Sequence, residues 1–153
     1  MPKHVFVLGP DDRNLQTLRD SPALEDCQLH RLLDSEDLVH VDRIDFDGLL
    51  ATADRRLREF DGPVDAVIGY WDFPVCTLVP LLCEARGLHS ADLRALLKCE
   101  HKYWSRLEQR KVIADLPDFA VLDLDQDAKP PEDVTYPMWL NEVYQGSWTG
   151  PLD

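Results

Sequence analysis

The sequence has few of the features that usually mark a functional site. Only seven of its 153 residues are glycine, and they form no glycine-rich phosphate loop. The four cysteines contain no CxxC pair, and the five histidines lack the spacing of a metal site. A GxSxG nucleophile motif is also absent. We therefore expect no disulfides, no metal ligands and no catalytic residues of these classes.

The sequence also lacks an apolar run long enough to span a bilayer. The longest run, from Phe73 to Leu82, is too short and contains two prolines. The formal net charge of −13 repels phosphate backbones and anionic lipids. We expect a cytoplasmic protein that binds neither nucleic acid nor membranes, although this charge is compatible with a local cationic pocket.

The first 89 residues alternate between apolar runs and amphipathic segments. The expected strands are His4–Leu8, Cys27–Leu33 and Val64–Tyr70, and the expected helices cover residues 12–18, 45–60 and 73–86. Asp11 and Asp12 offer an N-cap to the first helix. This order predicts an α/β domain with a Rossmann-like open parallel sheet and helices on both faces.

Residues 90–153 have a different pattern, which predicts a short α+β extension. Helices are expected at Ser90–Leu97 and Lys102–Ala114, and strands at Phe119–Leu124 and Thr135–Leu140. From Asn141 onward neither period is present, so we expect an irregular tail.

Two cations in the second region form the most informative cluster. Lys102 and Arg106 are four residues apart, so they share one face of the expected helix. Two cations on one face suit a polyphosphate, because each holds a different oxygen. The alternative is an ordinary solvated face whose charge is balanced by Glu108 and Asp115.

Asp72 is the candidate binding residue of the first region. It follows the third expected strand, and ligands of open parallel sheets bind beyond the carboxyl ends of their strands. The alternative is that Asp72 caps the next helix, two residues before Pro74. Both roles are compatible with the sequence.

A long stretch of the chain resembles the ATP-grasp superfamily. The resemblance is carried by VDAVIGYWDFPVCTLVPLLCEARGL and by LRALLKCEHKYWSRLEQRKVIADLPDFAVLD, with Gly87-Leu88, Lys102, Arg106 and Pro117 at the matching positions. It implies that residues 1–89 are a pre-ATP-grasp domain, similar to the N-terminal domain of biotin carboxylase. Residues 90–153 would then be a helical linker and the incomplete start of the ATP-grasp region.

The resemblance also implies that Lys102 helps to hold the phosphates of ATP. The family's second phosphate-binding lysine has no counterpart, because Asn141 and Glu142 follow the matching strand. The family's lid and Mg²⁺ ligands come in later segments, beyond Asp153. We therefore expect a partial relative of ATP-dependent carboxylate–amine ligases, with weak ATP binding, Mg²⁺ binding only with the missing segment, and weak or no catalysis alone.

A different class of function uses the aromatic residues near the C-terminus. Trp139, Tyr144 and Trp148 follow no core period and would form a docking surface. In this alternative the chain is a non-catalytic binding or assembly module whose partner is a second protein chain or another copy of itself.

Overall fold

The computed structural model describes residues 2–38, 44–123, 134, 138–141 and 148–152. The chain divides into two compact units, residues 1–93 and 94–153. The sequence pattern placed a boundary after residue 89. Each unit is described by itself below.

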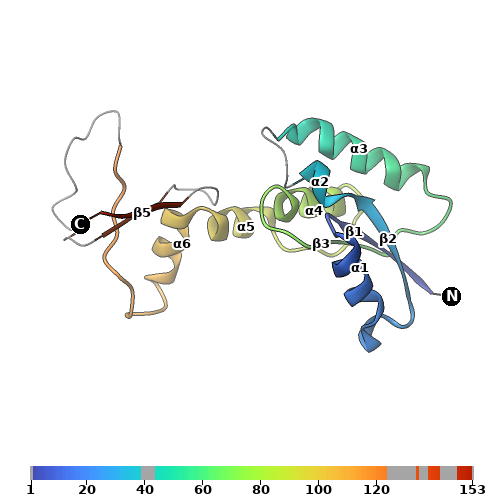
Figure 1. Ribbon diagram of the computed structural model, residues 1–153, viewed down its shortest axis with the longest axis horizontal. Helices are drawn as coiled ribbons and strands as arrows, with labels where there is room; N and C mark the ends of the chain where they lie inside the picture. Colours follow the sequence, from blue (N-terminus) through green and yellow to red (C-terminus); the bar gives the residue numbers. More distant parts are fainter. Residues whose placement is uncertain (1, 39–43, 124–133, 135–137, 142–147, 153) are drawn as a thin grey trace. The chain divides into compact units, whose positions relative to one another are not determined.

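The first unit alternates strands and helices (Figure 1). Its elements are β1 (Lys3–Leu8), α1 (Asp12–Arg19), a 3-10 turn (Pro22–Leu24), β2 (Cys27–Leu33), α2 (Ser35–Leu38), α3 (Phe46–Glu59), β3 (Ala66–Gly69) and α4 (Val75–Glu84). Asp11 caps α1 and accepts the Asn14 N–H at 2.6 Å, as the sequence predicted. The prediction of an α/β unit is confirmed.

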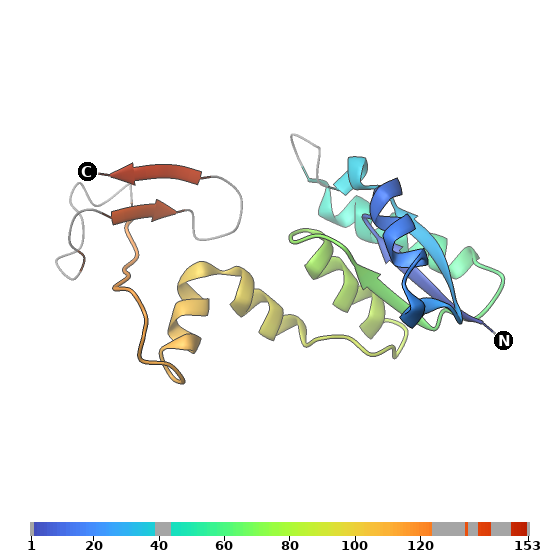
Figure 2. The same cartoon turned by 60° about the horizontal axis from the view of Figure 1, so that its bottom comes forward.

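The described strands of the first unit form a parallel sheet in the order β2-β1-β3. Side chains of β1 alternate between the two faces, and both faces are buried. Phe6 and Leu8 belong to the main core with residues of α3 and α4. Val7, on the opposite face, is fully buried, and Leu15 of α1 is also buried. Figures 1 and 2 show α1 and α3 on opposite sides of the sheet.

The second unit contains two short helices and a strand pair. Its elements are α5 (Leu93–Glu100), α6 (Lys102–Gln109), β4 (Met138–Asn141) and β5 (Trp148–Leu152), where α5 begins at the last residue of the first unit. The pair β4–β5 is antiparallel. Among the described residues, no helix has both the length and the hydrophobicity needed to cross a bilayer.

Four expectations for this unit were wrong. The first helix starts at Leu93 rather than Ser90, and the second ends at Gln109 rather than Ala114. Residues 119–123 form no strand, because they have no β partner in the described part of the chain. The tail is not wholly irregular, since β5 pairs with β4. The expected strand residues 135–137 lie outside the described residues.

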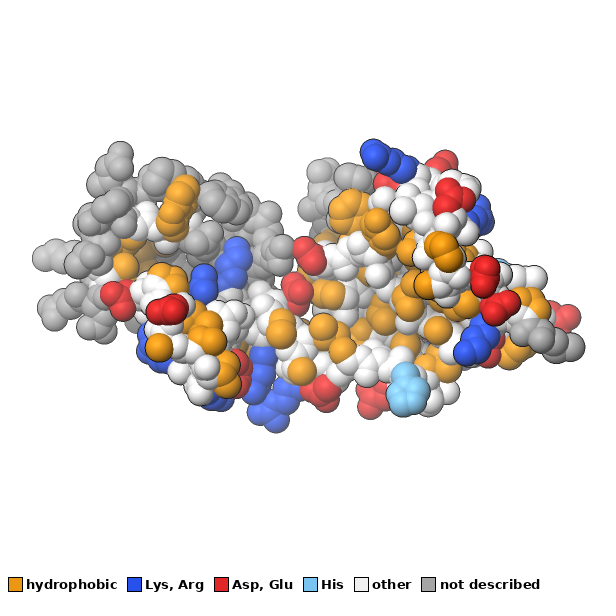
Figure 3. Space-filling model, turned by 90° about the horizontal axis from the view of Figure 1, so that it is seen from below, with side chains coloured by type: hydrophobic (Ala, Val, Ile, Leu, Met, Phe, Trp, Pro, Cys, Tyr) orange, Lys and Arg blue, Asp and Glu red, His pale blue; other side chains and the backbone are white. Residues whose placement is uncertain are grey.

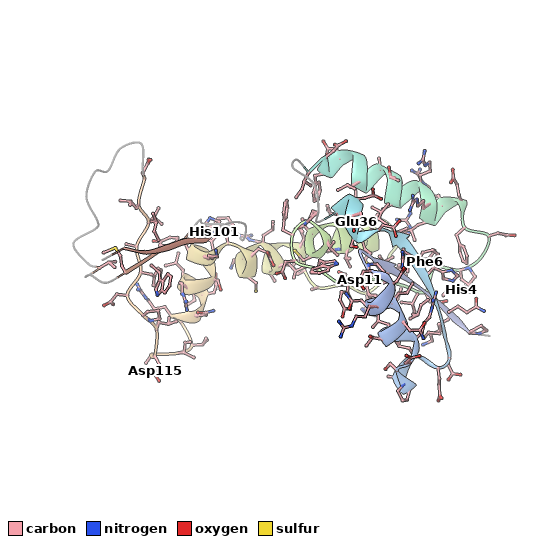
Figure 4. The ribbon with its side chains drawn as sticks, in the orientation of Figure 1. His4, Phe6, Asp11, Glu36, His101 and Asp115 are labelled. Carbon is pink, nitrogen blue, oxygen red and sulfur yellow. The ribbon has the colours of Figure 1, made fainter. Side chains whose placement is uncertain are left out.

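A cluster of rings packs at the amino end of the sheet, where Figure 4 shows His4 and Phe6. The His4 and His30 rings stack with centroids 5.2 Å apart, and His4 Nδ1 lies 2.9 Å from His30 Nε2. Phe6 and Phe60 complete the cluster, with ring centroids 4.8 and 5.0 Å from that of His30. Burial first, and the nearby His4 second, lower the pKa of His30 below 6.5. The carboxylate of Asp65 also lies near, accepting the backbone N–H of His4 at 2.7 Å.

This arrangement predicts that acid destabilises the fold through His30. Since the unfolded chain protonates this ring near pH 6.5 and the folded chain resists protonation, the unfolded state binds more protons. The free energy of unfolding should therefore fall as the pH drops from about 7 to about 5. The variant His30→Phe keeps an aromatic ring and removes the titration, so it should flatten this slope in urea unfolding. His89→Phe, at an exposed site, is the control, and equal flattening in both variants would contradict the prediction.

Candidate functional site

The carboxyl edge of the parallel sheet is formed by the segments that follow the three strands. Figure 4 shows Asp11 and Glu36 toward this edge, at the end of the sheet away from His4. After β1, Gly9 adopts a φ of 79°, which favours glycine. Its carbonyl accepts the indole N–H of Trp71 at 2.5 Å, which joins the segments after β1 and β3. A Cβ at Gly9 would lie 2.9 Å from Trp71 Cδ1, so the glycine also makes room for the indole.

Asp72 lies at this edge and is exposed. The residue at the N-cap of α4 is Pro74, which provides no side-chain cap. The backbone carbonyl of Asp72 accepts the N–H of Cys76 at 3.0 Å. The sequence suggested Asp72 as the N-cap of this helix. The helix begins at Val75 instead, so Pro74 occupies the N-cap position. A ligand-binding role of Asp72 stays a prediction.

Lys102 and Arg106 both lie on α6 and are half-buried. One helical turn separates them, so they occupy one face, as expected. Arg106 donates to Gln109 Oε1 at 3.2 Å, which is a neutral acceptor. Within the described part of the chain, no carboxylate lies at ion-pair distance from either cation. Asp72 belongs to the first unit, and these two cations belong to the second.

Glu108, which follows Arg106 by two residues, is engaged elsewhere. Its two oxygens accept from Lys98 Nζ and Lys111 Nζ, both at 2.6 Å. These bonds, with that from Lys111 the larger, lower the pKa of Glu108 to about 2. Figure 4 shows Asp115 beyond the end of α6 that is far from His101, the residue before Lys102. Glu108 and Asp115, the balancing acids of the alternative interpretation, therefore form no ion pair with Lys102 or Arg106 among the described contacts.

A third cation on the same face was not singled out from the sequence. Arg110 follows Arg106 by four residues, and its guanidinium carbon lies 4.3 Å from the centre of the Phe119 ring. Phe119 also contacts Tyr103 edge-to-face, with centroids 5.6 Å apart. The repeated spacing of four could have indicated Arg110, whereas the contact with Phe119 depends on a turn of the chain after α6. The stacking restricts Arg110 and leaves its N–H donors accessible at the edge of the guanidinium plane.

The charges around α6 form a local exception in an acidic protein. Six lysines and arginines but only two acids lie between Arg94 and Lys111, whereas the whole chain carries −13. Figure 3 shows basic side chains gathered over α5 and α6. Such a segment can bind an anion even though the net charge of the protein repels it at long range.

The ion-pair pattern gives a direct prediction for Glu108. Its carboxyl group should titrate at about pH 2, which carbon-13 NMR can follow. Lys111→Met should raise this midpoint toward 4.5, because it removes the larger of the two bonds. Any stability contributed by this carboxylate is present above pH 4.5 and is lost as the pH falls through about 2. The matched variant Lys102→Met should leave the midpoint unchanged; an equal rise would show that Glu108 also neutralises Lys102.

Comparisons with known proteins do not identify a relative. No protein-family model, no curated protein and no solved structure matches the chain. The argument for function therefore depends on the residues themselves.

Proposed function

We propose that the chain is an ATP-grasp-type protein that binds the phosphates of ATP through Lys102 and Arg106. In this proposal the first unit is the Rossmann-like, pre-ATP-grasp domain, and the second is the start of the ATP-grasp region. The counterpart activity is that of an ATP-dependent carboxylate–amine ligase, which forms an acyl phosphate and passes the acyl group to an amine. Binding, rather than efficient turnover, is the activity proposed for this chain.

The observation that carries the proposal is the selective pairing of charges around α6. Lys98 and Lys111 share Glu108, but Lys102 and Arg106 have no carboxylate partner among the described residues. Both side chains are half-buried, so part of each remains accessible to a ligand. Hydrogen bonds between such cations and phosphate oxygens are among the strong ones in proteins. A polyphosphate would supply the anionic oxygens that the described residues do not provide to these two cations.

The architecture of the first unit also supports this proposal. It has an open parallel sheet, with α1 packed on one face and α3 and α4 on the other. The sequence resemblance predicts such a unit before the lysine-bearing helix. The order of the strands changes direction at β1, and open sheets of this kind bind ligands at such points.

The residues of this sequence also explain why we propose ATP binding without efficient phosphoryl transfer. Asn141 is the last residue of β4 and stands where the resemblance places a second phosphate-binding lysine. An uncharged amide does not neutralise the charge that develops on a transferring phosphoryl group. We therefore propose weak ATP binding and little or no phosphoryl transfer by this chain alone. Separately, we propose that Asp72 contacts a ligand at the carboxyl edge of the sheet in the first unit.

Calorimetric titration with ATP, with and without Mg²⁺, tests the phosphate site. Lys102→Ala should weaken binding by about ten- to a hundredfold, since a hydrogen bond to a charged group is worth about 1.5–3 kcal/mol. Arg106→Gln should weaken it similarly. AMP should bind less tightly than ATP, because it offers fewer phosphate oxygens to the two cations.

The control for this titration is Lys111→Ala, on the same segment. Lys111 is already bonded to Glu108, so its loss should change ATP affinity far less than the loss of Lys102. Tight ATP binding that Lys102→Ala leaves unchanged would show that the site is assigned wrongly. Equal effects of Lys102→Ala and Lys111→Ala would show a general electrostatic attraction instead of a site.

A second candidate function is an assembly module, and exposed apolar side chains of the second unit favour it. The side chain of Trp139 is 58% exposed, and those of Val112 and Val121 are 80% and 50% exposed. A partner that covered these side chains would remove their apolar surface from water. The side chains of Tyr144 and Trp148 lie outside the described residues.

Light scattering over a range of protein concentrations distinguishes this second candidate. If the chain assembles with itself, the measured mass should rise with protein concentration. The variant Trp139→Ser should return the mass to that of the monomer. Ala51→Ser, at an exposed position of α3, is a control for a general change in surface polarity. A monomer at all concentrations would contradict assembly with another copy.

A further inference from the structure

The basic side chains around α6 divide into two groups. Lys98 and Lys111 both bond to Glu108. Glu108 lies about 200° around the helix from Arg106, because each residue turns an α-helix by about 100°. Arg110 follows Arg106 by four residues and therefore lies on the same side as Arg106. Among the described residues, a carboxylate thus neutralises the cations of the first group only.

Arg110 extends the pair of cations on this side of α6 to a row of three. Lys102, Arg106 and Arg110 follow one another at intervals of four residues, so they form one stripe along the helix. No described carboxylate lies at ion-pair distance from Arg110. The stripe covers two turns, or about 12 Å of helix rise. Three cationic groups in a row suit a linear chain of anionic groups.

The ring of Phe119 determines where the guanidinium of Arg110 lies. The guanidinium carbon is 4.3 Å from the centre of this ring, and the ring of Tyr103 contacts the same ring with centroids 5.6 Å apart. Tyr103 and Arg110 are about two helical turns apart, so a ring that contacts both brings the guanidinium back along α6 toward Tyr103. Because Tyr103 directly follows Lys102, this contact shortens the distance between the two ends of the stripe.

Stacking on a ring also leaves Arg110 able to bind an anion. The ring covers one face of the guanidinium, whereas the five N–H donors lie in its plane and point outward. Phe119 is half-buried and Arg110 is exposed, so the ring restricts the arginine without removing it from solvent. A restricted side chain loses less conformational entropy when a ligand binds. The alternative role is structural, in which Arg110 only anchors the segment after α6 to the helix.

We infer that Arg110 is the third phosphate-binding residue of the stripe and makes the site selective for a triphosphate over a diphosphate. This inference rests on the phosphate site proposed above and specifies the ligand class of that site. A chain of three phosphates offers anionic oxygens to all three cations, whereas a chain of two offers them to only two. Phe119 is then a positioning residue, since it acts on the ligand through Arg110.

Inorganic tripolyphosphate and pyrophosphate form a matched pair of probes. They differ by one phosphate and carry no nucleoside, so the ratio of their affinities measures the contribution of the third phosphate. In calorimetric titrations of the full chain, Arg110→Gln should weaken tripolyphosphate binding by about fivefold and pyrophosphate binding by less than about twofold. Lys111→Gln removes the neighbouring charge, which is already bonded to Glu108, and should leave the ratio unchanged. Equal weakening of both probes by Arg110→Gln would overturn the inference.

Variants of the ring separate phosphate binding by Arg110 from a structural role. Phe119→Leu keeps the arginine but removes the ring, and it should lower the ratio of affinities by about two- to threefold. Phe119→Tyr keeps the ring and should retain the wild-type ratio. Arg110→Lys keeps the charge and should recover part of the affinity that Arg110→Gln loses. Circular dichroism checks that each variant is folded, and Arg110→Lys with Phe119→Leu carries the test if Arg110→Gln is not.

The outcomes distinguish failure of this inference from failure of the ATP proposal. If Lys102→Ala weakens ATP binding but Arg110→Gln leaves the ratio of affinities at its wild-type value, the phosphate site stands and the role of Arg110 is overturned. If tripolyphosphate binds with the expected selectivity and ATP does not bind, the ATP proposal fails and the selectivity stands. If neither ligand binds saturably up to about 10 mM, both are overturned.

Discussion

The pairing of β1 with strands on both of its sides is the constraint on which the first unit depends. β2 and β3 each form a parallel ladder with β1 and have no other strand partner in the described part of the chain. A parallel ladder buried on two faces must be covered by helices on both, because its side chains are apolar on both. Phe6 and Leu8 require α3 and α4, and Val7 requires α1. Removing the apolar character of β1 would therefore separate all of these elements at once.

This constraint also shapes the carboxyl edge of the sheet. Leaving β1, the chain turns at Gly9, whose lack of a Cβ admits Trp71 from the segment after β3. At Gly69, the last residue of β3, a Cβ would lie 2.7 Å from Val75 Cγ1, so this glycine lets α4 pack close to the strand. The core thus draws the segments after β1 and β3 together, while Tyr70 and Phe73 stay exposed beside them. Rigid packing beneath an exposed surface is the arrangement that a binding site requires.

The sequence was sufficient to predict the elements whose stability depends mostly on local interactions or on burial. The apolar run of β1, the weaker alternation of β2 and the Asp11 cap of α1 are present as expected, because buried or alternating strands and capped helices are recognisable from their own residues. The strand β5 is not recognisable from its own residues in this way. It contains Pro151, and it forms only because β4 pairs with it, which depends on residues well outside its own segment. The expected strand at residues 119–123 failed for the converse reason, since strand-like residues without a partner form no ladder.

The candidate site could likewise be predicted from the sequence only in part. The shared face of Lys102 and Arg106 follows from their spacing alone, but the absence of a carboxylate partner among the described residues does not. It depends on Glu108, which the sequence places two residues after Arg106 and the structure bonds to Lys98 and Lys111. The ring of Phe119 under Arg110, and the stack of Phe73 on Phe46, likewise join residues that no local pattern connects. Spacing identifies which groups share a helix face, whereas the partners of those groups require the tertiary fold.

At the proposed phosphate site, the local arrangement of charges matters more than the net charge of the protein. A net charge of −13 repels every anion at long range and attracts every cation, yet at physiological salt this field is screened beyond about 8 Å. Within that distance, a phosphate at the proposed site would meet Lys102, Arg106 and Arg110, which follow one another at intervals of four residues. Because Glu108 bonds to Lys98 and Lys111, no described carboxylate competes with a phosphate for Lys102 and Arg106.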